Sequence, residues 1–142
     1  MLLVLKGSKE MFDIKMLIEK AKEARQKAYA PYSNFYVGAS ILLKNGEYIL
    51  GCNVENASYG LCNCAERTAL FTMIAEGYNK DDVVAMCIIG DTDLPISPCG
   101  ACRQVMLELL NSETKIVMAN IKGDFKEINM HELLPYSFKD LN

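Results

Sequence analysis

Three cysteines and one glutamate stand in two short motifs whose spacing suits metal chemistry. The first motif is Cys64-Ala65-Glu66, and the second is Pro98-Cys99-Gly100-Ala101-Cys102. Each motif opens an expected helix, and the unpaired N–H groups of a helix N-terminus stabilise thiolates. Two such helix ends facing each other would hold the sulfurs of Cys64, Cys99 and Cys102 around a soft divalent ion. Zinc accepts this geometry, and three protein ligands leave its fourth position open for water.

Glu66 lies two residues after the first expected ligand, so its carboxylate reaches the space beside the metal without binding it. There it can take a proton from water at the open position and pass it to a substrate and a leaving group. Three thiolates around a dication leave a net negative charge, which weakens the effect of the metal on water. Arg67 lies one helical turn from Cys64 and can offset this charge by hydrogen bonding to the sulfurs. We therefore expect Glu66 to be catalytic and Arg67 to support the ligands.

A Cys-x-x-Cys pair has several plainer interpretations. Taken alone, Cys99 and Cys102 are more often a structural zinc half-site, a redox pair or core residues than part of a catalytic site. Their combination with Pro98 and with the Cys64-Ala65-Glu66 motif reverses this balance in favour of catalysis.

Three further side chains invite a functional role. Cys62 stands two residues before an expected ligand, but zinc already has three sulfurs and a water, so we expect Cys62 to serve packing. His131, the only histidine, lies far from the motifs and is expected to be a solvated structural residue. Arg103 follows the last ligand and is equally compatible with supporting the cysteines or with a surface charge.

The composition limits the classes of protein to which the chain can belong. Its 142 residues suit one domain, and 51% hydrophobic residues are sufficient for a core. The net charge is −3 without an evident basic cluster, which argues against a nucleic-acid partner. The apolar run at residues 1–5 is too short for a signal peptide or a membrane span. Six cysteines without a secretory signal indicate reduced thiols or metal ligands, so a cytoplasmic protein without a membrane partner is expected.

The elements that must position these residues follow from periodicity and turn residues. A hairpin is expected around Asn45-Gly46, and strand–helix–strand units in the later part favour parallel pairing. These elements predict an α/β fold, a three-layer α/β/α sandwich with a mixed five-stranded sheet. Residues 13–142 form one domain, after a short leader at 1–12 whose role the sequence does not indicate. The expected helices are 14–28, 64–76, 99–110 and 130–134, and the expected strands are 37–43, 47–54, 83–89, 115–120 and 125–128.

Several stretches together resemble one enzyme family. Zinc deaminases carry His or Cys, then Glu two residues later, followed by Pro-Cys-x-x-Cys. Over about residues 14–138 the chain resembles the cytidine deaminases of the small homotetrameric type, which use Cys as the first ligand. The resemblance implies one zinc ion per subunit and hydrolytic deamination of free cytidine or deoxycytidine in pyrimidine salvage. The matching stretches are 29–33, 51–57, 62–68, 97–104 and 133–135.

The resemblance also implies residues that bind the nucleoside. Asn53 and Glu55 would bind the ribose, with Glu55 accepting a hydrogen bond from the 3′-hydroxyl. A carboxylate there repels a phosphate, so a polynucleotide would be rejected. Phe35 would pack beside the base, and the Ala65 backbone would face the pyrimidine edge.

The remaining implied residues serve a neighbouring subunit. Phe138 matches a C-terminal aromatic residue that stacks on the base in the site of the next subunit. Tyr59 and Gly60 fall where neighbouring chains complete the site. A homotetramer is therefore expected from the resemblance.

Other functions remain open at the level of the sequence. The substrate could be another small molecule that contains cytosine, such as blasticidin S, although Asn53 and Glu55 favour an ordinary nucleoside. A non-catalytic zinc module is a further alternative, against which Glu66 argues. The sequence does not distinguish cytidine from deoxycytidine.

Overall fold

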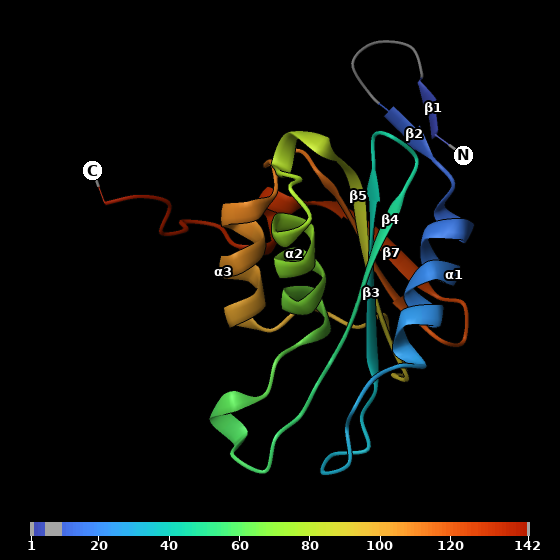
Figure 1. Cartoon of the computed structure of the whole chain (residues 1–142). Helices are drawn as coiled ribbons and strands as arrows, with labels where there is room; N and C mark the ends of the chain where they lie inside the picture. Colours follow the sequence, from blue (N-terminus) through green and yellow to red (C-terminus); the bar gives the residue numbers. More distant parts are fainter. Residues whose placement is uncertain (1, 5–9, 142) are drawn as a thin grey trace.

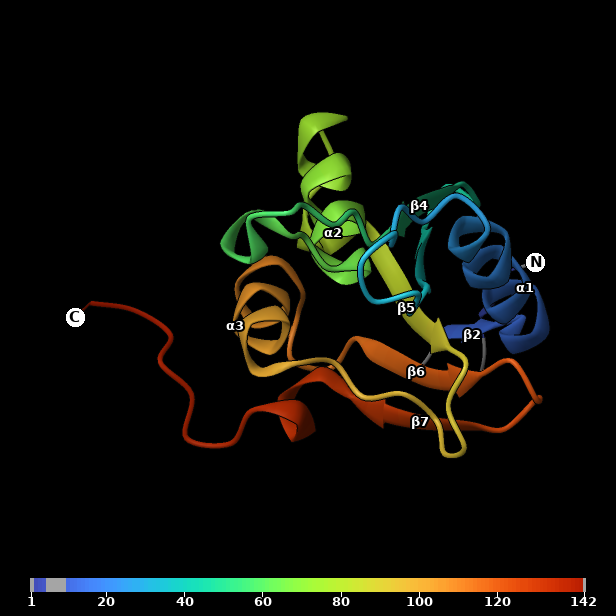
Figure 2. The ribbon, with the colours of Figure 1, turned by 90° about the horizontal axis from the view of Figure 1, so that it is seen from below.

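A mixed five-stranded sheet separates one helix from two others in the computed structural model of the chain (Figure 1). The structure describes residues 2–4 and 10–141. Helix α1 (Ile14–Arg25) covers one face, and α2 (Ala65–Ala75) and α3 (Gly100–Leu109) cover the other (Figure 2). The predicted three-layer α/β/α sandwich is confirmed. The strands are β3 (Val37–Leu43), β4 (Tyr48–Cys52), β5 (Val83–Gly90), β6 (Lys115–Asn120) and β7 (Phe125–Asn129), in the order β4-β3-β5-β6-β7.

Only one of the two expected strand–helix–strand units places its two strands side by side in the sheet. Strand β3 pairs antiparallel with both β4 and β5, β5 pairs parallel with β6, and β6 pairs antiparallel with β7. Of the parallel pairing expected in the later part of the chain, one adjacent pair is therefore present, β5 and β6, which α3 connects. The unit β4-α2-β5 does not make neighbouring strands, because β3 lies between β4 and β5.

Two glycines allow helices on opposite faces to lie directly against strand backbone. A Cβ atom on Gly51 of β4 would collide with the Ala69 nitrogen and would lie 2.6 Å from the Ala65 carbonyl oxygen of α2. A Cβ atom on Gly38 of β3 would collide with the backbone of α1 at Ala21. Because Gly51 removes this obstacle, the first turn of α2 is held close to β4.

The central strands of the sheet are buried on both faces, as their apolar sequences require. Every residue of β3 and β5 is buried, which suits strands covered by helices on both sides. One apolar cluster lies under α2 and α3 and includes Leu70, Met73 and Met106. A second lies under α1 and includes Leu17 and Ala21.

Element ends differ from the sequence-based expectations in several places. The first helix ends at Arg25 instead of 28, and the strand expected at 47–54 spans Tyr48–Cys52. The last expected helix is a 3-10 helix, η3 (Met130–Leu133). Two further short 3-10 helices are η1 (Tyr59–Leu61) and η2 (Lys80–Asp82).

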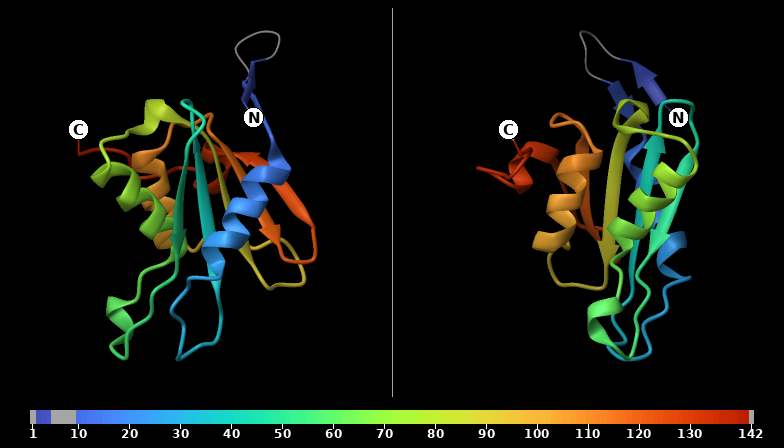
Figure 3. Two further views of the ribbon diagram at one scale, coloured as in Figure 1. Left: turned by 45° about the vertical axis from the view of Figure 1, so that its right-hand side comes forward. Right: turned by 60° about the vertical axis from the view of Figure 1, so that its left-hand side comes forward.

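The leader contains strands that the sequence analysis did not predict. Strands β1 (Leu2–Val4) and β2 (Glu10–Phe12) pair antiparallel in a separate two-stranded sheet (Figure 3). Residues 1 and 5–9 of the proposed leader, and residue 142 of the proposed domain, lie outside the described residues. No helix within the described part of the chain is long and apolar enough to cross a membrane.

Candidate metal centre

The N-termini of α2 and α3 bring three cysteine sulfurs together. Cys64 is the N-cap residue of α2, Cys99 is the N-cap residue of α3, and Cys102 lies in the first turn of α3. Their Sγ atoms all lie within 4.8 Å of one another. The Cys102 backbone N–H donates to the Cys99 Sγ atom over 3.4 Å, so the helix end itself stabilises this sulfur. Three thiols at two helix N-termini, with no fourth protein ligand grouped with them among the described residues, fit a zinc site with an open position.

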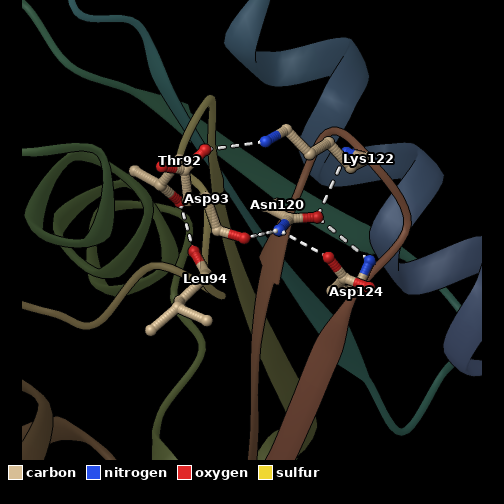
Figure 4. Close-up of polar contacts among 6 residues, drawn as sticks. All are labelled: Thr92, Asp93, Leu94, Asn120, Lys122 and Asp124. Carbon is tan, nitrogen blue, oxygen red and sulfur yellow. Dashed lines mark hydrogen bonds and ion pairs between the residues drawn. The ribbon is translucent and has the colours of Figure 1, made fainter.

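A buried asparagine holds the segment that leads from β5 to Cys99. Asn120, at the end of β6, is fully buried, and its amide nitrogen donates to the Asp93 carbonyl and to the Asp124 carboxylate (Figure 4). Its amide oxygen accepts from the backbone N–H groups of Lys122 and Asp124. Further along, the Ile96 N–H donates to the Ala119 carbonyl. The approach to Cys99 is therefore tied to the parallel pair β5–β6.

The thiols and one arginine set the charge of the cluster. A hydrogen bond from the Cys102 thiol, with a further one from the Arg67 guanidinium, lowers the pKa of Cys64 to about 5. The same bond, together with burial, raises the pKa of the Cys102 thiol above its usual range. The Arg67 Nη2 atom lies 3.2 Å from the Cys64 Sγ atom. Arg67 thus contacts a sulfur of the cluster, one helical turn away as its spacing predicts.

Glu66 lies in the first turn of α2, beside the sulfurs and away from solvent. Its side chain is 4% exposed, and burial raises the pKa of its carboxyl group. The Cys102 thiol lies close enough to oppose this shift through a hydrogen bond. A buried carboxyl group with a raised pKa, next to a metal site, is suited to accept and return protons.

Backbone pairing brings the expected ribose-binding segment next to Cys64. Val54 pairs on one side with Tyr29 and on the other with Asn63, the residue before Cys64. The segments 29–35 and 53–64 consequently lie at the same end of the sheet (Figure 3). Asn53 and Glu55, which flank Val54, are therefore close in space to the start of α2.

Asn53 and Glu55 both bind the loop between α1 and β3. The Asn53 side chain accepts from the Val37 N–H and donates to the Phe35 carbonyl, each over 2.8 Å. The Glu55 carboxylate accepts from the backbone N–H groups of Tyr32 and Ser33, each over 3.1 Å, and from the Ser33 hydroxyl. The Ser33 hydroxyl bond is the main reason that the pKa of Glu55 is lowered from its ordinary value.

The other expected site residues comprise one buried residue beside Cys64 and four residues on exposed segments. Phe35 is 39% exposed in the loop before β3, and Ala65 is fully buried at the start of α2. Tyr59 begins the short helix η1 and is 77% exposed, with Gly60 beside it. Phe138 is 64% exposed on the C-terminal segment, which runs away from the sheet in Figure 1. Phe35, Tyr59, Gly60 and Phe138 are therefore open to solvent within one chain.

Two residues near the site received no definite role from sequence analysis. Arg103 donates to the Pro98 carbonyl and to the Leu133 carbonyl, each over 2.8 Å, and also to the Ser97 hydroxyl. It therefore ties the turn before Cys99 to the C-terminal part, which decides against a simple surface charge.

Ser33 was not singled out, although it stands in the matching stretch 29–33. Its position two residues before an aromatic residue, in a turn-forming Ser-Asn pair, was the available signal. Cys62 lies outside the sulfur cluster. Its Sγ atom accepts from the Asn56 backbone N–H and donates to the Asn56 carbonyl.

Comparisons with known proteins agree with this geometry. The model of the cytidine and deoxycytidylate deaminase zinc-binding region matches residues 11–119. A protein named cytidine deaminase from Halalkalibacterium halodurans is 54% identical over 132 residues, which cover 92% of this chain and 98% of the relative. The crystal structure of cytidine deaminase from Burkholderia pseudomallei matches with a TM-score of 0.87 and 54% identity, over 89% of this chain and all of that one. Cytidine deaminase from Mycobacterium tuberculosis matches with a TM-score of 0.77 and 37% identity, over 90% of this chain and 98% of that one.

Proposed function

Because this chain belongs to the cytidine and deoxycytidylate deaminase family, we propose that its cysteine cluster is the zinc site of a nucleoside deaminase. Its activity is the hydrolytic deamination of cytidine or deoxycytidine, which yields uridine or deoxyuridine and ammonia. The observation that carries the site assignment is the grouping of Cys64, Cys99 and Cys102 beside the buried Glu66. The names of the relatives support cytidine over blasticidin S as the substrate.

The proposed centre divides the chemistry among a few residues. Cys64, Cys99 and Cys102 would hold zinc, which when bound supplies a Lewis acid that makes water easier to deprotonate. Glu66 takes a proton from the attacking water and delivers it to the ring nitrogen. It then takes the second proton from the hydroxyl that the water has added to the ring carbon and gives it to the amino group, which leaves as ammonia. Arg67 neutralises part of the thiolate charge through its contact with Cys64.

Substrate recognition is proposed for the segments that meet at Val54. Glu55 would accept a hydrogen bond from the 3′-hydroxyl, and Asn53 would face the same sugar. Phe35 packs beside the base, and the Ala65 backbone meets the pyrimidine edge. The position of this segment next to Cys64, through the Val54–Asn63 pairing, supports a nucleoside that spans both regions. The ionised Glu55 disfavours a 3′-phosphodiester and hence a polynucleotide.

We also propose a homotetramer in which neighbouring subunits complete the site. Helix α2 exposes Phe71 at 49% and Ile74 at 45%, and η1 exposes Leu61 at 70%. A neighbouring subunit would cover these apolar side chains. Tyr59, Gly60 and Phe138 would then contact a neighbouring active site.

The six free cysteines further support a cytoplasmic location, where pyrimidine salvage would use free nucleosides.

The zinc assignment is tested by a matched pair of cysteine variants. Purified protein is expected to contain about one zinc ion per chain and to release ammonia from cytidine. Cys64→Ser should lose most of both, because it removes one of three ligands. Cys62→Ser, only two residues away but outside the cluster, should keep both. Elemental analysis and an ammonia assay measure the two properties, and full zinc content in Cys64→Ser would contradict the proposal.

A further inference from the structure

The loop between α1 and β3 is organised around one hydroxyl group, that of Ser33. This hydroxyl contacts the Glu55 Oε2 atom and also accepts a hydrogen bond of 3.0 Å from the Phe35 backbone N–H. An ionised carboxylate can only accept, so the Ser33 O–H must donate to Glu55. The result is a directed chain from the Phe35 N–H through the Ser33 hydroxyl to the Glu55 carboxylate. Ser33 thus joins a residue proposed to face the base with one proposed to bind the sugar.

The backbone of Phe35 is held on both sides. Its N–H is bound by Ser33, and its carbonyl oxygen accepts from the Asn53 side chain over 2.8 Å. Asn34, between Ser33 and Phe35 in the chain, adopts the left-handed conformation with φ of 57°, which asparagine tolerates better than most residues. Phe35 is therefore placed by hydrogen bonds to its backbone, while the residue as a whole remains 39% exposed.

The acceptor sites of Glu55 indicate where a sugar hydroxyl would bind. Its two oxygens offer about four acceptor positions when ionised. Oε1 takes two of them for the backbone N–H groups of Tyr32 and Ser33, and Oε2 takes one for the Ser33 hydroxyl. The remaining position lies on Oε2. A hydroxyl bound to Glu55 would therefore share its oxygen with Ser33.

We propose that Ser33 is a positioning residue that couples recognition of the ribose 3′-hydroxyl at Glu55 to the placement of Phe35 beside the base. This proposal rests on the proposed function, since it assumes that Glu55 and Phe35 bind a nucleoside. The bonds from the Phe35 N–H to Ser33 and from Ser33 to Glu55 run in one direction and strengthen one another. The Ser33 hydroxyl therefore holds the Phe35 backbone and also fixes the orientation of the carboxylate that would receive the sugar hydroxyl. Ser33 itself does not touch the reacting atoms.

The first test compares substrates with and without a 3′-hydroxyl. Ser33→Ala should raise KM for cytidine by about tenfold, the usual effect of losing a hydrogen bond to a charged group. The increase for 2′,3′-dideoxycytidine should be clearly smaller, because that substrate cannot bind Oε2 through a 3′-hydroxyl. The kcat value should change little, since Glu66 and the cysteines are unaffected. Equal increases in KM for both substrates would overturn the proposal, because a merely structural hydroxyl would affect both alike.

Two further variants separate the hydroxyl from loop packing. Ser33→Thr keeps a hydroxyl and should restore most of the discrimination, whereas Ser33→Val has nearly the shape of threonine without the hydroxyl and should behave as Ser33→Ala. This pair decides the question even if Ser33→Ala does not fold. Ser112→Ala, at an exposed serine far from the loop, should match the unaltered protein in KM for both substrates. Equal behaviour of the Thr and Val variants would also overturn the proposal.

Coupling between the two binding sides is tested by a double-mutant cycle. Glu55→Gln and Phe35→Ala, measured as kcat/KM for cytidine, should be non-additive by at least about threefold in the otherwise unaltered chain. The same cycle combined with Ser33→Ala should be additive. Unchanged coupling would show that Ser33 does not link the two residues. If the unaltered protein did not deaminate cytidine at all, the proposed function would fail, whereas these outcomes concern Ser33 alone.

Discussion

The two halves of the proposed site lie side by side but are built from different kinds of structure. The sulfurs and Glu66 belong to the first turns of α2 and α3, and Glu66 is only 4% exposed. Apart from Ala65, the nucleoside half consists of loops and the short helix η1, and in it Phe35 is 39% exposed and Phe138 is 64% exposed. The metal half is thus formed within one chain, while the nucleoside half is open to solvent or to another chain.

This difference has a physical reason. Metal ligands need fixed positions, and helix N-termini packed on a sheet provide both rigidity and favourable charge. Gly51 contributes by letting α2 lie against β4. A substrate must enter and leave, which favours exposed loops supported by a rigid scaffold. Variants in the metal half should therefore affect chemistry or metal content, and variants in the nucleoside half should affect substrate binding.

The sharpest separation is expected from Glu66→Gln. Loss of the proton carrier should lower kcat by about 10²–10⁴-fold, while zinc content remains unchanged because Glu66 is not a ligand. Glu76→Gln, at the exposed C-terminal end of the same helix, is the matched control and should keep normal activity. Single-turnover rates and elemental analysis measure both effects. Normal turnover of cytidine by Glu66→Gln would refute the proton-carrier role.

A smaller effect within the metal half is expected from Arg67→Ala. Removing the guanidinium leaves the thiolate charge on Cys64 without its hydrogen bond, so zinc affinity or turnover should fall by about 10–100-fold. Competition with a chelator measures the affinity. Arg67→Lys keeps the charge but lacks the planar guanidinium group, so its zinc affinity and turnover should lie between those of the unaltered protein and those of Arg67→Ala. If Arg67→Ala left both metal content and rate unchanged, Arg67 would have no part in the centre.

The smallest effect should come from the nucleoside half, through Phe138. Phe138→Ala should raise KM for cytidine by about tenfold, the usual effect of losing one stacked aromatic ring. If this ring serves a neighbouring subunit, hybrids of Phe138→Ala and Glu66→Gln chains should regain a low KM. In such hybrids the inactive chains still supply Phe138 to active neighbours. Co-purified hybrids that kept the high KM would contradict completion of the site between subunits.

Regular elements were predictable because their signals are local. The strand at 37–43 and the helix starts near Cys64 and Cys99 were confirmed, since apolar periodicity and N-terminal residues act over a few positions. The prediction of helix to residue 28 was wrong because apolar spacing continues past Arg25, whereas Tyr29 must pair with Val54. The strand expected to continue through Val54 ends at Cys52, and Val54 instead bridges two other segments.

The sequence alone was enough to identify the three cysteine ligands, the neighbouring carboxyl group and the layered fold. Each of these follows from the spacing of residues within short stretches of the chain. Only the tertiary structure decided that Ser33 joins Glu55 to Phe35, and that Arg103 ties Pro98 to Leu133. The Ser33–Glu55 and Arg103–Leu133 contacts connect segments that are distant in the chain, where no periodicity applies. Their geometry exists only after the sheet and helices have brought the loops together.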